Sequence, residues 1–234
     1  MKIDLSKKPK SPIIIEGFPG FGLIGTITTE FLIDQLKAEL IGTIKLEDIP
    51  AMVAIHDGHV VQPIGLFYDH KSNLLIVHVI TNVQGMEWEL SDAIVQLAKQ
   101  LDAKEVISLE GVAAPIATET TKTFYYASAK ENRKRFMDLG IDQLREGIII
   151  GVTGALLLHE DIPITAVFAE THSGLPDSKA AAQIIEVLDK YIGLKLPTKP
   201  LLEQAEKFEQ KVRSLIERSK MTSDEQKKRM SYVG

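Results

Sequence analysis

The segment from Gly17 to Gly25, GFPGFGLIG, contains the residues of this chain whose types and spacing best suit the binding of an anion. Gly20, Gly22 and Gly25 fit the pattern G-x-G-x-x-G between an apolar run that predicts a strand and a segment that predicts a helix. In dinucleotide-binding folds such glycines let a pyrophosphate approach the free N–H groups at the helix N-terminus. The segment therefore raises the hypothesis of a nucleotide site.

The residues that should accompany a nucleotide site are poorly placed. An acidic ribose ligand is expected about 20 residues after the glycines, at the end of the second strand. Glu39 precedes that strand, Glu47 comes later than the pattern requires, and Pro19 is unusual inside the turn. The favoured interpretation is a tight turn from strand to helix, in which glycines permit close packing.

The other side chains capable of chemistry form no convincing catalytic or metal-binding set. Cysteine is absent, which excludes thiol nucleophiles and disulfides. His56 and His59 flank a predicted turn without a third ligand nearby, and neither H-E-x-x-H nor G-x-S-x-G occurs. His172 and Ser173 are neighbours, but adjacent side chains on an extended segment point apart. We expect no metal, no cofactor and no enzymatic activity.

Four segments that follow predicted strands could still line a crevice, because ligands of open α/β sheets bind beyond the carboxyl ends of the strands. These segments are residues 17–25, 82–85, 110–115 and 170–174. The candidate pocket residues are Gly20, Gly22, Glu110 and His172. The alternative function is a small-molecule or nucleotide-binding enzyme that uses the glycine turn and the loops at Glu110 and Glu170.

The elements that would position these residues follow from the spacing of apolar side chains. Strands are predicted at residues 12–18, 40–46, 52–55, 60–68, 73–80, 106–109, 123–127, 147–152 and 164–168. Helices are predicted at residues 22–36, 90–101, 131–139 and 178–191, with a short one after Gly154. This alternation predicts an α/β fold with a mostly parallel or mixed sheet and helices on both faces.

The composition changes after residue 194. Residues 1–194 are predicted to form the α/β body, residues 195–200 a linker with two prolines, and residues 220–234 a flexible tail. Between them, residues 201–219 carry apolar side chains at heptad spacing and predict a helix. That helix either packs back on the body or forms an arm to another subunit or protein, so a scaffold that binds through it is a further alternative.

The charge and hydropathy of the chain limit its partners. The net charge of −5 is uneven, because residues 199–234 carry nine Lys and Arg against six Asp and Glu, which leaves −8 on the other 198 residues. An acidic body argues against nucleic acid. No apolar run reaches the roughly 18 residues that a membrane span needs, and the N-terminus lacks the apolar stretch of a signal peptide. We expect a cytoplasmic protein.

Several of these segments together resemble the proteasome assembly chaperone family, the archaeal relatives of the second eukaryotic assembly-chaperone subunit. The resemblance rests on Gly17–Gly25, on Glu110-Gly111, on residues 154–158 (GALLL) and on residues 174–181 (GLPDSKAA), and it covers roughly residues 12–192. It implies a three-layer α/β fold similar to purine nucleoside phosphorylases, homo-oligomers, and binding to subunits of the 20S proteasome, α type being expected. It implies no known reaction.

The resemblance also draws attention to the C-terminus. Some members end, like proteasome activators, in a hydrophobic residue, Tyr and any residue, whereas Tyr232 of this chain is third from the end. Tyrosine suits an anchor in a small pocket, and the basic residues before it would speed encounter with an acidic surface. The residues predicted to bind a partner are Lys227, Lys228, Arg229, Tyr232, Val233 and Gly234.

Overall fold

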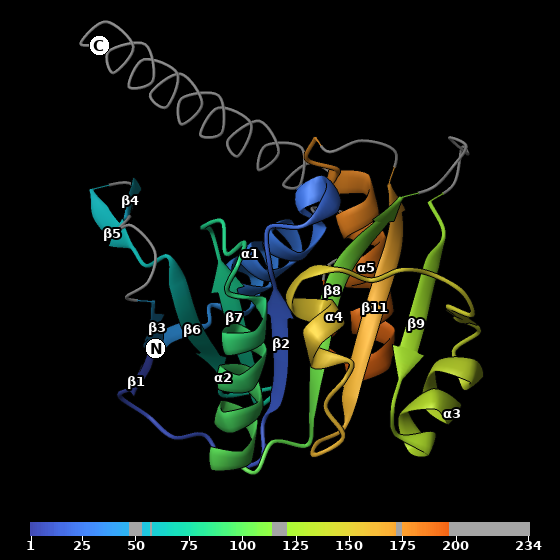
Figure 1. Ribbon diagram of the computed structural model, residues 1–234, viewed down its shortest axis with the longest axis horizontal. Helices are drawn as coiled ribbons and strands as arrows, with labels where there is room; N and C mark the ends of the chain where they lie inside the picture. The colour runs from blue at the N-terminus through green and yellow to red at the C-terminus, as the bar shows by residue number, and fades with distance from the viewer. Residues whose placement is uncertain (47–52, 57, 114–120, 172–174, 197–234) are drawn as a thin grey trace, which may run out of the picture.

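The computed structural model describes residues 1–46, 53–56, 58–113, 121–171 and 175–196, with the side chains of His56 and His59 left out. In this part of the chain nine strands form one mixed sheet in the order β1-β3-β6-β7-β2-β8-β11-β9-β10 (Figure 1). The strands are β1 (Lys2–Leu5), β2 (Ile13–Gly17), β3 (Glu39–Lys45), β6 (Ile64–Asp69), β7 (Leu74–Val79), β8 (Glu105–Ala113), β9 (Thr123–Ala127), β10 (Asp142–Gln143) and β11 (Ile164–Thr171). A separate hairpin contains β4 (Ala54–His56) and β5 (His59–Val61).

The helices form the two outer layers. They are α1 (Ile24–Leu36), preceded by the short 3-10 turn η1 (Phe21–Leu23), and α2 (Glu87–Gln100), α3 (Lys130–Asp138), α4 (Gly151–Leu156) and α5 (Ser178–Ile192). Successive side chains of a strand point to opposite faces. Ile15 of β2 accordingly packs in a core with α1, α3 and α5, whereas Ile14 packs in a core with α2 and α4. The predicted α/β fold with helices on both faces is confirmed.

The four central strands run parallel, and this arrangement sets the position of the crevice. Strand β2 pairs with β7 on one side and with β8 on the other, and β8 also pairs with β11, all in parallel. Because α2 connects β7 to β8, the chain crosses over β2 on one face of the sheet. The carboxyl ends of β7, β2, β8 and β11 therefore meet at one edge, where open α/β folds usually bind ligands.

Helix α5 shows why the predicted helix at residues 178–191 forms where the sequence places it. The carboxylate of Asp177 accepts the backbone N–H of Ala180 at 3.0 Å and so caps the helix N-terminus. At the other end Gly193 adopts a φ of +82° and stops the helix. Leu196 then packs into the core at 8% exposure, with its N–H bonded to the Asp189 carboxylate at 3.1 Å.

The predicted strand at Gly147–Val152 is wrong. Residues 147–150 form an irregular segment, and α4 begins at Gly151, whose φ of +83° breaks any extended conformation. Ile148 and Ile150 are 93% and 78% exposed, although the apolar run suggested burial. The segment lies across the carboxyl edge of the sheet rather than within it (Figure 1).

Other differences concern the ends and edges of strands. Strands β8 and β11 extend to Ala113 and Thr171, so Glu110 and Glu170 belong to strands and not to loops. The predicted strand at residues 60–68 is divided at Pro63, which has no N–H to donate to a sheet. The sequence analysis missed β1 and β10, which are short strands at the two edges of the sheet.

Some predictions fall on residues that the structure does not describe. These are the heptad helix, the tail with its partner-binding residues, most of the linker, and His172. The division of the chain into body, linker, helix and tail stays a prediction. None of the described helices is both long and apolar enough to cross a membrane.

Candidate functional site: an acidic crevice beyond the central strands

The glycine turn owes part of its composition to the close approach of two backbones. A Cβ on Gly17 of β2 would lie 2.2 Å from the carbonyl oxygen of Gly25, in the first turn of α1. A Cβ on Gly25 would in turn lie 2.9 Å from the Gly17 Cα and 2.7 Å from the Leu109 carbonyl oxygen of β8. These distances are too short for any side chain, so both glycines are required for packing.

Gly22 has a different role in the same turn. Its φ is +69°, and the following residue, Leu23, is also left-handed with a φ of +51°. The Gly22 carbonyl accepts the backbone N–H of Asp177 at 2.9 Å, which ties the turn to the start of α5. Gly22 is buried and does not line the crevice.

Gly20 and Glu110 lie in direct contact beneath the turn. A Cβ on Gly20 would lie 2.1 Å from the Oε1 atom of Glu110. The Glu110 carboxylate accepts the N–H of Gly111 at 3.2 Å and the hydroxyl of Thr153 at 3.1 Å, together with the N–H of Phe21. The protein thus places its own carboxylate at the Phe21 N–H of the glycine turn, close to where a nucleotide fold would bind phosphate.

A second acid lies behind the first. Glu16 of β2 is fully buried, and neither of its carboxylate oxygens has a hydrogen-bond partner of good geometry. The Ser108 hydroxyl bonds to Thr153 at 2.8 Å, and Thr153 donates to Glu110. Since each hydroxyl has a single proton, Ser108 must then donate to Thr153 and has none left for a charged Glu16.

Burial sets the acid–base properties of both carboxyl groups, and at Glu16 the shortage of donors adds to its effect. Burial raises the pKa of Glu16 to about 8, and the negative charge of Glu110 adds to the rise, whereas the nearby Ser108 hydroxyl lowers the pKa. Burial also raises the pKa of Glu110 to about 7, against the hydrogen bonds from Thr153, Gly111 and Phe21. A protonated Glu16 can donate to Ser108, which satisfies the chain of hydroxyl groups.

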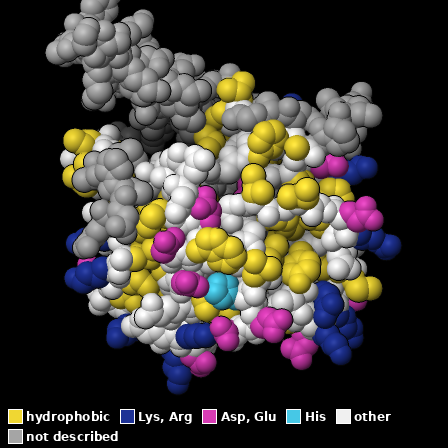
Figure 2. Space-filling view, viewed as in Figure 1, with side chains coloured by type: hydrophobic (Ala, Val, Ile, Leu, Met, Phe, Trp, Pro, Cys, Tyr) yellow, Lys and Arg dark blue, Asp and Glu magenta, His cyan; other side chains and the backbone are white. Residues whose placement is uncertain are grey.

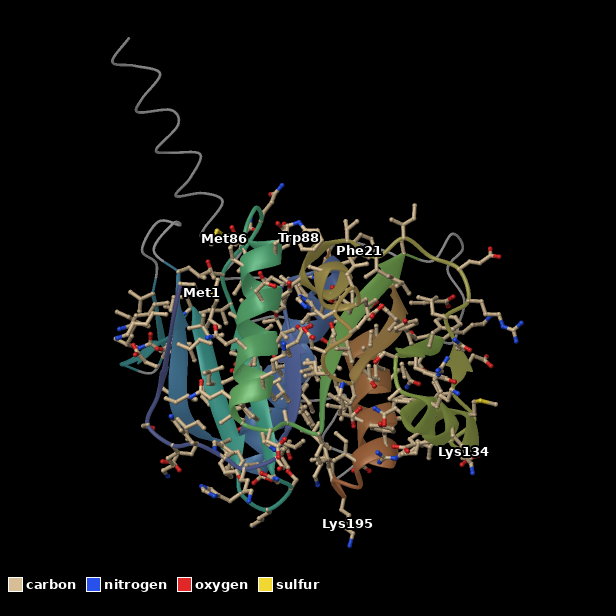
Figure 3. All side chains as sticks on the ribbon, turned by 60° about the horizontal axis from the view of Figure 1, so that its bottom comes forward. Met1, Phe21, Met86, Trp88, Lys134 and Lys195 are labelled. Atoms are coloured by element: carbon tan, nitrogen blue, oxygen red, sulfur yellow. The ribbon has the colours of Figure 1, made fainter. Side chains whose placement is uncertain are left out.

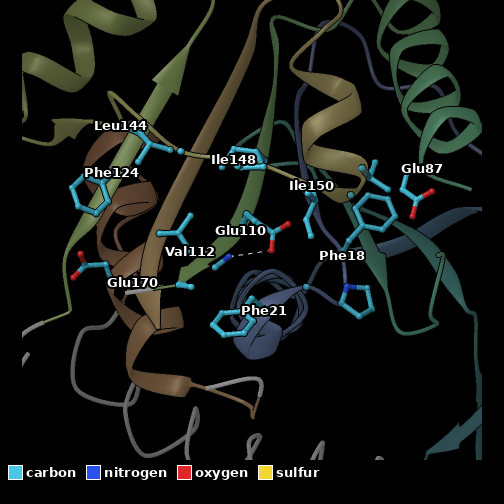
Figure 4. A pocket seen from close by; sticks show the side chains of 18 of the residues that line it. Phe18, Phe21, Glu87, Glu110, Val112, Phe124, Leu144, Ile148, Ile150 and Glu170 are labelled. Atoms are coloured by element: carbon cyan, nitrogen blue, oxygen red, sulfur yellow. Dashed lines mark hydrogen bonds between the residues drawn. The ribbon is translucent and has the colours of Figure 1, made fainter. Parts of the chain in front are cut away.

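The crevice itself opens beyond the carboxyl ends of β2, β8 and β11 and has a volume of about 1070 Å³. It is lined by residues 18–21, 82–84, 110–113 and 142–152 and by Glu87, Phe124 and Glu170. Figure 4 shows Glu110 in the middle of the crevice, with Glu87 toward one end and Glu170 toward the other. Phe21 and Ile150 lie on either side of Glu110 (Figure 4).

The structure brings together most of the segments expected at this edge. Gly20 and Glu110 line the crevice, together with residues 82–84 and Glu170, whereas His172 lies outside the described residues. Ligand binding by these residues stays a prediction. Phe124 and residues 142–150 also line the crevice, but they were not predicted to do so from the sequence. The only available signal was the apolar run between Gly147 and Gly151, which was predicted to be a buried strand.

Two side-chain sets resemble catalytic triads but are closed to substrate. Thr29 bonds to Nδ1 of His78 at 2.8 Å, and Nε2 of His78 lies 2.9 Å from the Glu30 carboxylate. The Thr29 side chain is fully buried, its hydroxyl also bonds to the Gly25 and Thr26 carbonyls, and His78 is 2% exposed. The hydroxyl therefore cannot reach a substrate.

The second set joins α2 to the chain after α4. Ser91 and Asp92 both face the same Nε2 atom of His159, at 3.3 and 3.4 Å, so the ring cannot relay a proton between them. Ser91 is also fully buried. Within the described ranges, no group of three or more His, Asp and Glu side chains is arranged to hold a metal ion.

These features define a three-layer α/β protein with a crevice at the carboxyl edge of its sheet and a half-buried acid, Glu110, at the centre of that crevice. The PAC2 family model matches residues 14–216, so the chain belongs to the PAC2 family. An uncharacterized protein of Methanocaldococcus jannaschii is 27% identical over 231 residues, which are 96% of this chain and 94% of that protein.

Two solved structures extend the comparison. Pyrococcus furiosus PbaA, described as an archaeal homolog of proteasome-assembly chaperone, is 30% identical, with a TM-score of 0.84 and coverage of 95% of this chain and 100% of that one. Pyrococcus furiosus PbaB, described as an archaeal proteasome activator, is 22% identical, with a TM-score of 0.74 and coverage of 92% and 98%. The resemblance to the proteasome assembly chaperone family is confirmed.

Replacement of Gly20 by alanine should destabilise the protein through Glu110 and not through the backbone, since the φ of Gly20 is −109°. The new methyl group would displace a carboxylate held by three hydrogen bonds, and we expect a loss of roughly 1–3 kcal/mol in the free energy of unfolding. Gly147→Ala is the matched control, because it lines the same crevice with ordinary contacts of 3.5 Å and more. Urea denaturation measures the free energy of unfolding of both variants. If the two variants are equally stable, Gly20 and Glu110 are not in close contact.

The stability of the protein should fall as the pH rises from about 4.5 to about 8, because over this range folded Glu16 keeps a proton that the unfolded chain releases. Glu16→Gln is neutral at every pH, so its stability should fall less over the same range, by an amount on the order of a few kcal/mol. Urea denaturation at a series of pH values measures the slopes. The control is Glu186→Gln, which changes an exposed residue of α5. If the stability of Glu16→Gln changes with pH in the same way as that of Glu186→Gln and of the unaltered chain, Glu16 does not carry a buried proton.

Proposed function

We propose that this protein is an oligomer that binds proteasome subunits and assists assembly of the 20S proteasome. The observation that carries the proposal is the likeness to the Pyrococcus furiosus chaperone homolog, which extends over nearly the whole of both chains. The crevice supports it, since the triad-like sets described here are closed and Glu110 already accepts the Phe21 N–H of the glycine turn. A protein-binding role needs neither an open nucleophile nor an anion site.

Exposed apolar side chains supply the surface that such a role requires. Trp88 of α2 is 61% exposed, Ile148 and Ile150 before α4 are 93% and 78% exposed, and Leu158 after α4 is 69% exposed. All four flank the helices α2 and α4, and Figure 2 shows apolar side chains on the face that carries these helices. Large apolar residues gathered on one face are typical of protein–protein contacts.

We also assign a contact with proteasome α subunits to the body, the C-terminal tail or both. The tail residues Lys227–Arg229 and Tyr232–Gly234 lie outside the described residues, and their role is argued from the sequence. A single short tail buries less than the roughly 1,200 Å² of a standard interface, so one contact would be weak. Several tails on one oligomer raise the effective concentration and give useful avidity.

The alternative function, a small-molecule or nucleotide-binding enzyme, is favoured by one observation. A crevice of about 1070 Å³ at the carboxyl edge of a parallel sheet has the place and nearly the size of ordinary ligand pockets. The Glu110 carboxylate weighs against it, because it repels the phosphates of a nucleotide. A nucleoside present at about 100 times its dissociation constant should stabilise the fold by ~2.7 kcal/mol in a thermal-shift assay.

A chain that ends at Leu196 should keep the subunit number of the full protein. The expectation follows from the exposed apolar residues of the body, such as Ile148 and Ile150, and Leu196 itself stays in its buried place against Asp189. Light scattering on the truncated and full chains measures their masses. A monomeric truncated chain shows instead that residues after 196 hold the subunits together.

Deletion of Ser231–Gly234 should weaken binding to isolated proteasome α subunits, because it removes Tyr232 and moves the terminal carboxylate. We expect a loss of at least about tenfold in affinity, as for other anchor residues. A Tyr232→Phe variant of the full-length chain is the control for the hydroxyl group alone. Surface plasmon resonance measures all three, and undiminished binding of the shortened chain places the contact on the body.

A further inference from the structure

The crevice has a strong excess of negative charge. Five acidic residues line it, Glu87, Glu110, Asp142, Glu146 and Glu170, together with a single basic residue, Arg145. Among the described residues, no ion pair involves any of these five carboxylates. Walls of low dielectric constant concentrate the field of such charges, so the crevice attracts cations and repels anions.

The same crevice has apolar walls. Phe21 is 39% exposed beside the glycine turn, and Ile148 and Ile150 are almost fully exposed on the opposite wall. Phe124 of β9 lies near Glu170, at one end of the crevice (Figure 4). A ligand that fits this lining needs apolar groups for the walls and positive charges for the acids, which include Glu110 in the middle of the crevice (Figure 4).

Trp88 is a further exposed aromatic residue, next in sequence to the crevice residue Glu87. It follows Glu87 in the first turn of α2 and is 61% exposed. Figure 3 places Phe21, Met86 and Trp88 at one end of the molecule, away from Lys134 and Lys195. Trp88 therefore lies at the same end of the molecule as Phe21 of the crevice (Figure 3).

We propose that this crevice binds an extended segment of a partner protein in which apolar side chains alternate with lysine or arginine. The apolar side chains would pack between Phe21 and Ile150, and the basic side chains would pair with Glu170 at one end and Glu87 at the other. This inference rests on the proposed function, and it assigns that function a docking site on the body. It does not involve the C-terminal tail.

The size and charge of the crevice favour a peptide over other ligands. A volume of about 1070 Å³ reaches the upper limit of pockets for single small molecules. Phosphate-bearing ligands, nucleic acid and anionic lipid surfaces all carry the same sign of charge as the lining. A peptide can supply apolar and cationic groups at separate points along its length, as the positions of Phe21, Ile150 and Glu170 require.

The probes for the test are two fluorescent peptides with the same leucines and phenylalanines, one with lysines and the other with glutamates at the intervening positions. Fluorescence anisotropy with the full chain should show saturable binding of the lysine peptide and none of the glutamate peptide. Spermine serves as a competitor. The proposal of a peptide site is wrong if both peptides bind equally. It is also wrong if spermine displaces the lysine peptide at a concentration as low as that of the peptide, because charge alone would then account for the binding.

Variants of the crevice make the test specific. Glu170→Gln should weaken binding of the lysine peptide roughly tenfold, since it removes a partner of the basic side chains. Ile150→Ser, a change at an exposed residue, should weaken it to a similar degree. The control is Glu186→Gln, which makes the same change of charge at an exposed position on α5. If Glu170→Gln and Glu186→Gln bind the lysine peptide alike, the crevice is not the docking site.

The same variants separate this inference from the proposed function. If Glu170→Gln and Ile150→Ser still bind proteasome α subunits at full strength, the crevice is not the site of that contact, and the proteasome partner stands. If the lysine peptide binds in the crevice and the α subunits do not bind the unaltered chain, the docking site stands and its partner is another protein.

Discussion

The crevice depends on one close contact, the approach of the turn after β2 and the start of α1 to the backbone of β8. Gly17, Gly25 and Gly111 permit it, since a Cβ on any of them would lie within 3 Å of a backbone atom. This contact brings the N–H of Phe21 to the carboxylate of Glu110. The position of Glu110 and the shape of this side of the crevice are therefore consequences of a single packing arrangement.

The buried acid determines which ligands the crevice can accept. In a nucleotide-binding fold, the free N–H groups at the helix N-terminus attract a phosphate. Here Glu110 already accepts the N–H groups of Phe21 and Gly111, and Glu16 lies behind it. A phosphate would have to displace a hydrogen-bonded carboxyl group, so the motif G-x-G-x-x-G is present and its usual ligand is disfavoured.

Much of the fold was predictable from the sequence, because the central strands and the helices α1, α2 and α5 have clear apolar periodicity. The segment at Gly147–Val152 was not, since an apolar run between glycines has the same composition whether it is buried in a sheet or exposed at its edge. The ends of strands could not be predicted from the apolar pattern either, and Glu110 and Glu170 were therefore assigned to loops. Glu16 is the only charged residue of the apolar central strand β2, and this position could have indicated a buried acid.

The exposure of Ile148 and Ile150 supports the proposal that the crevice binds another protein. An unpaired apolar side chain in water gains about 1.5–3 kcal/mol when it becomes buried, and two such residues next to Phe21 provide a substantial part of the affinity of a small interface. The surrounding carboxylates add affinity for basic side chains, reject acidic partners and speed the approach of basic ones. The apolar walls therefore contribute mainly affinity, and the carboxylates contribute mainly selectivity for basic partners. An oligomer that repeats this crevice on each subunit can hold a partner through several weak contacts at once. Because each contact is weak, the loss of one of them lowers the overall affinity and favours release of the partner.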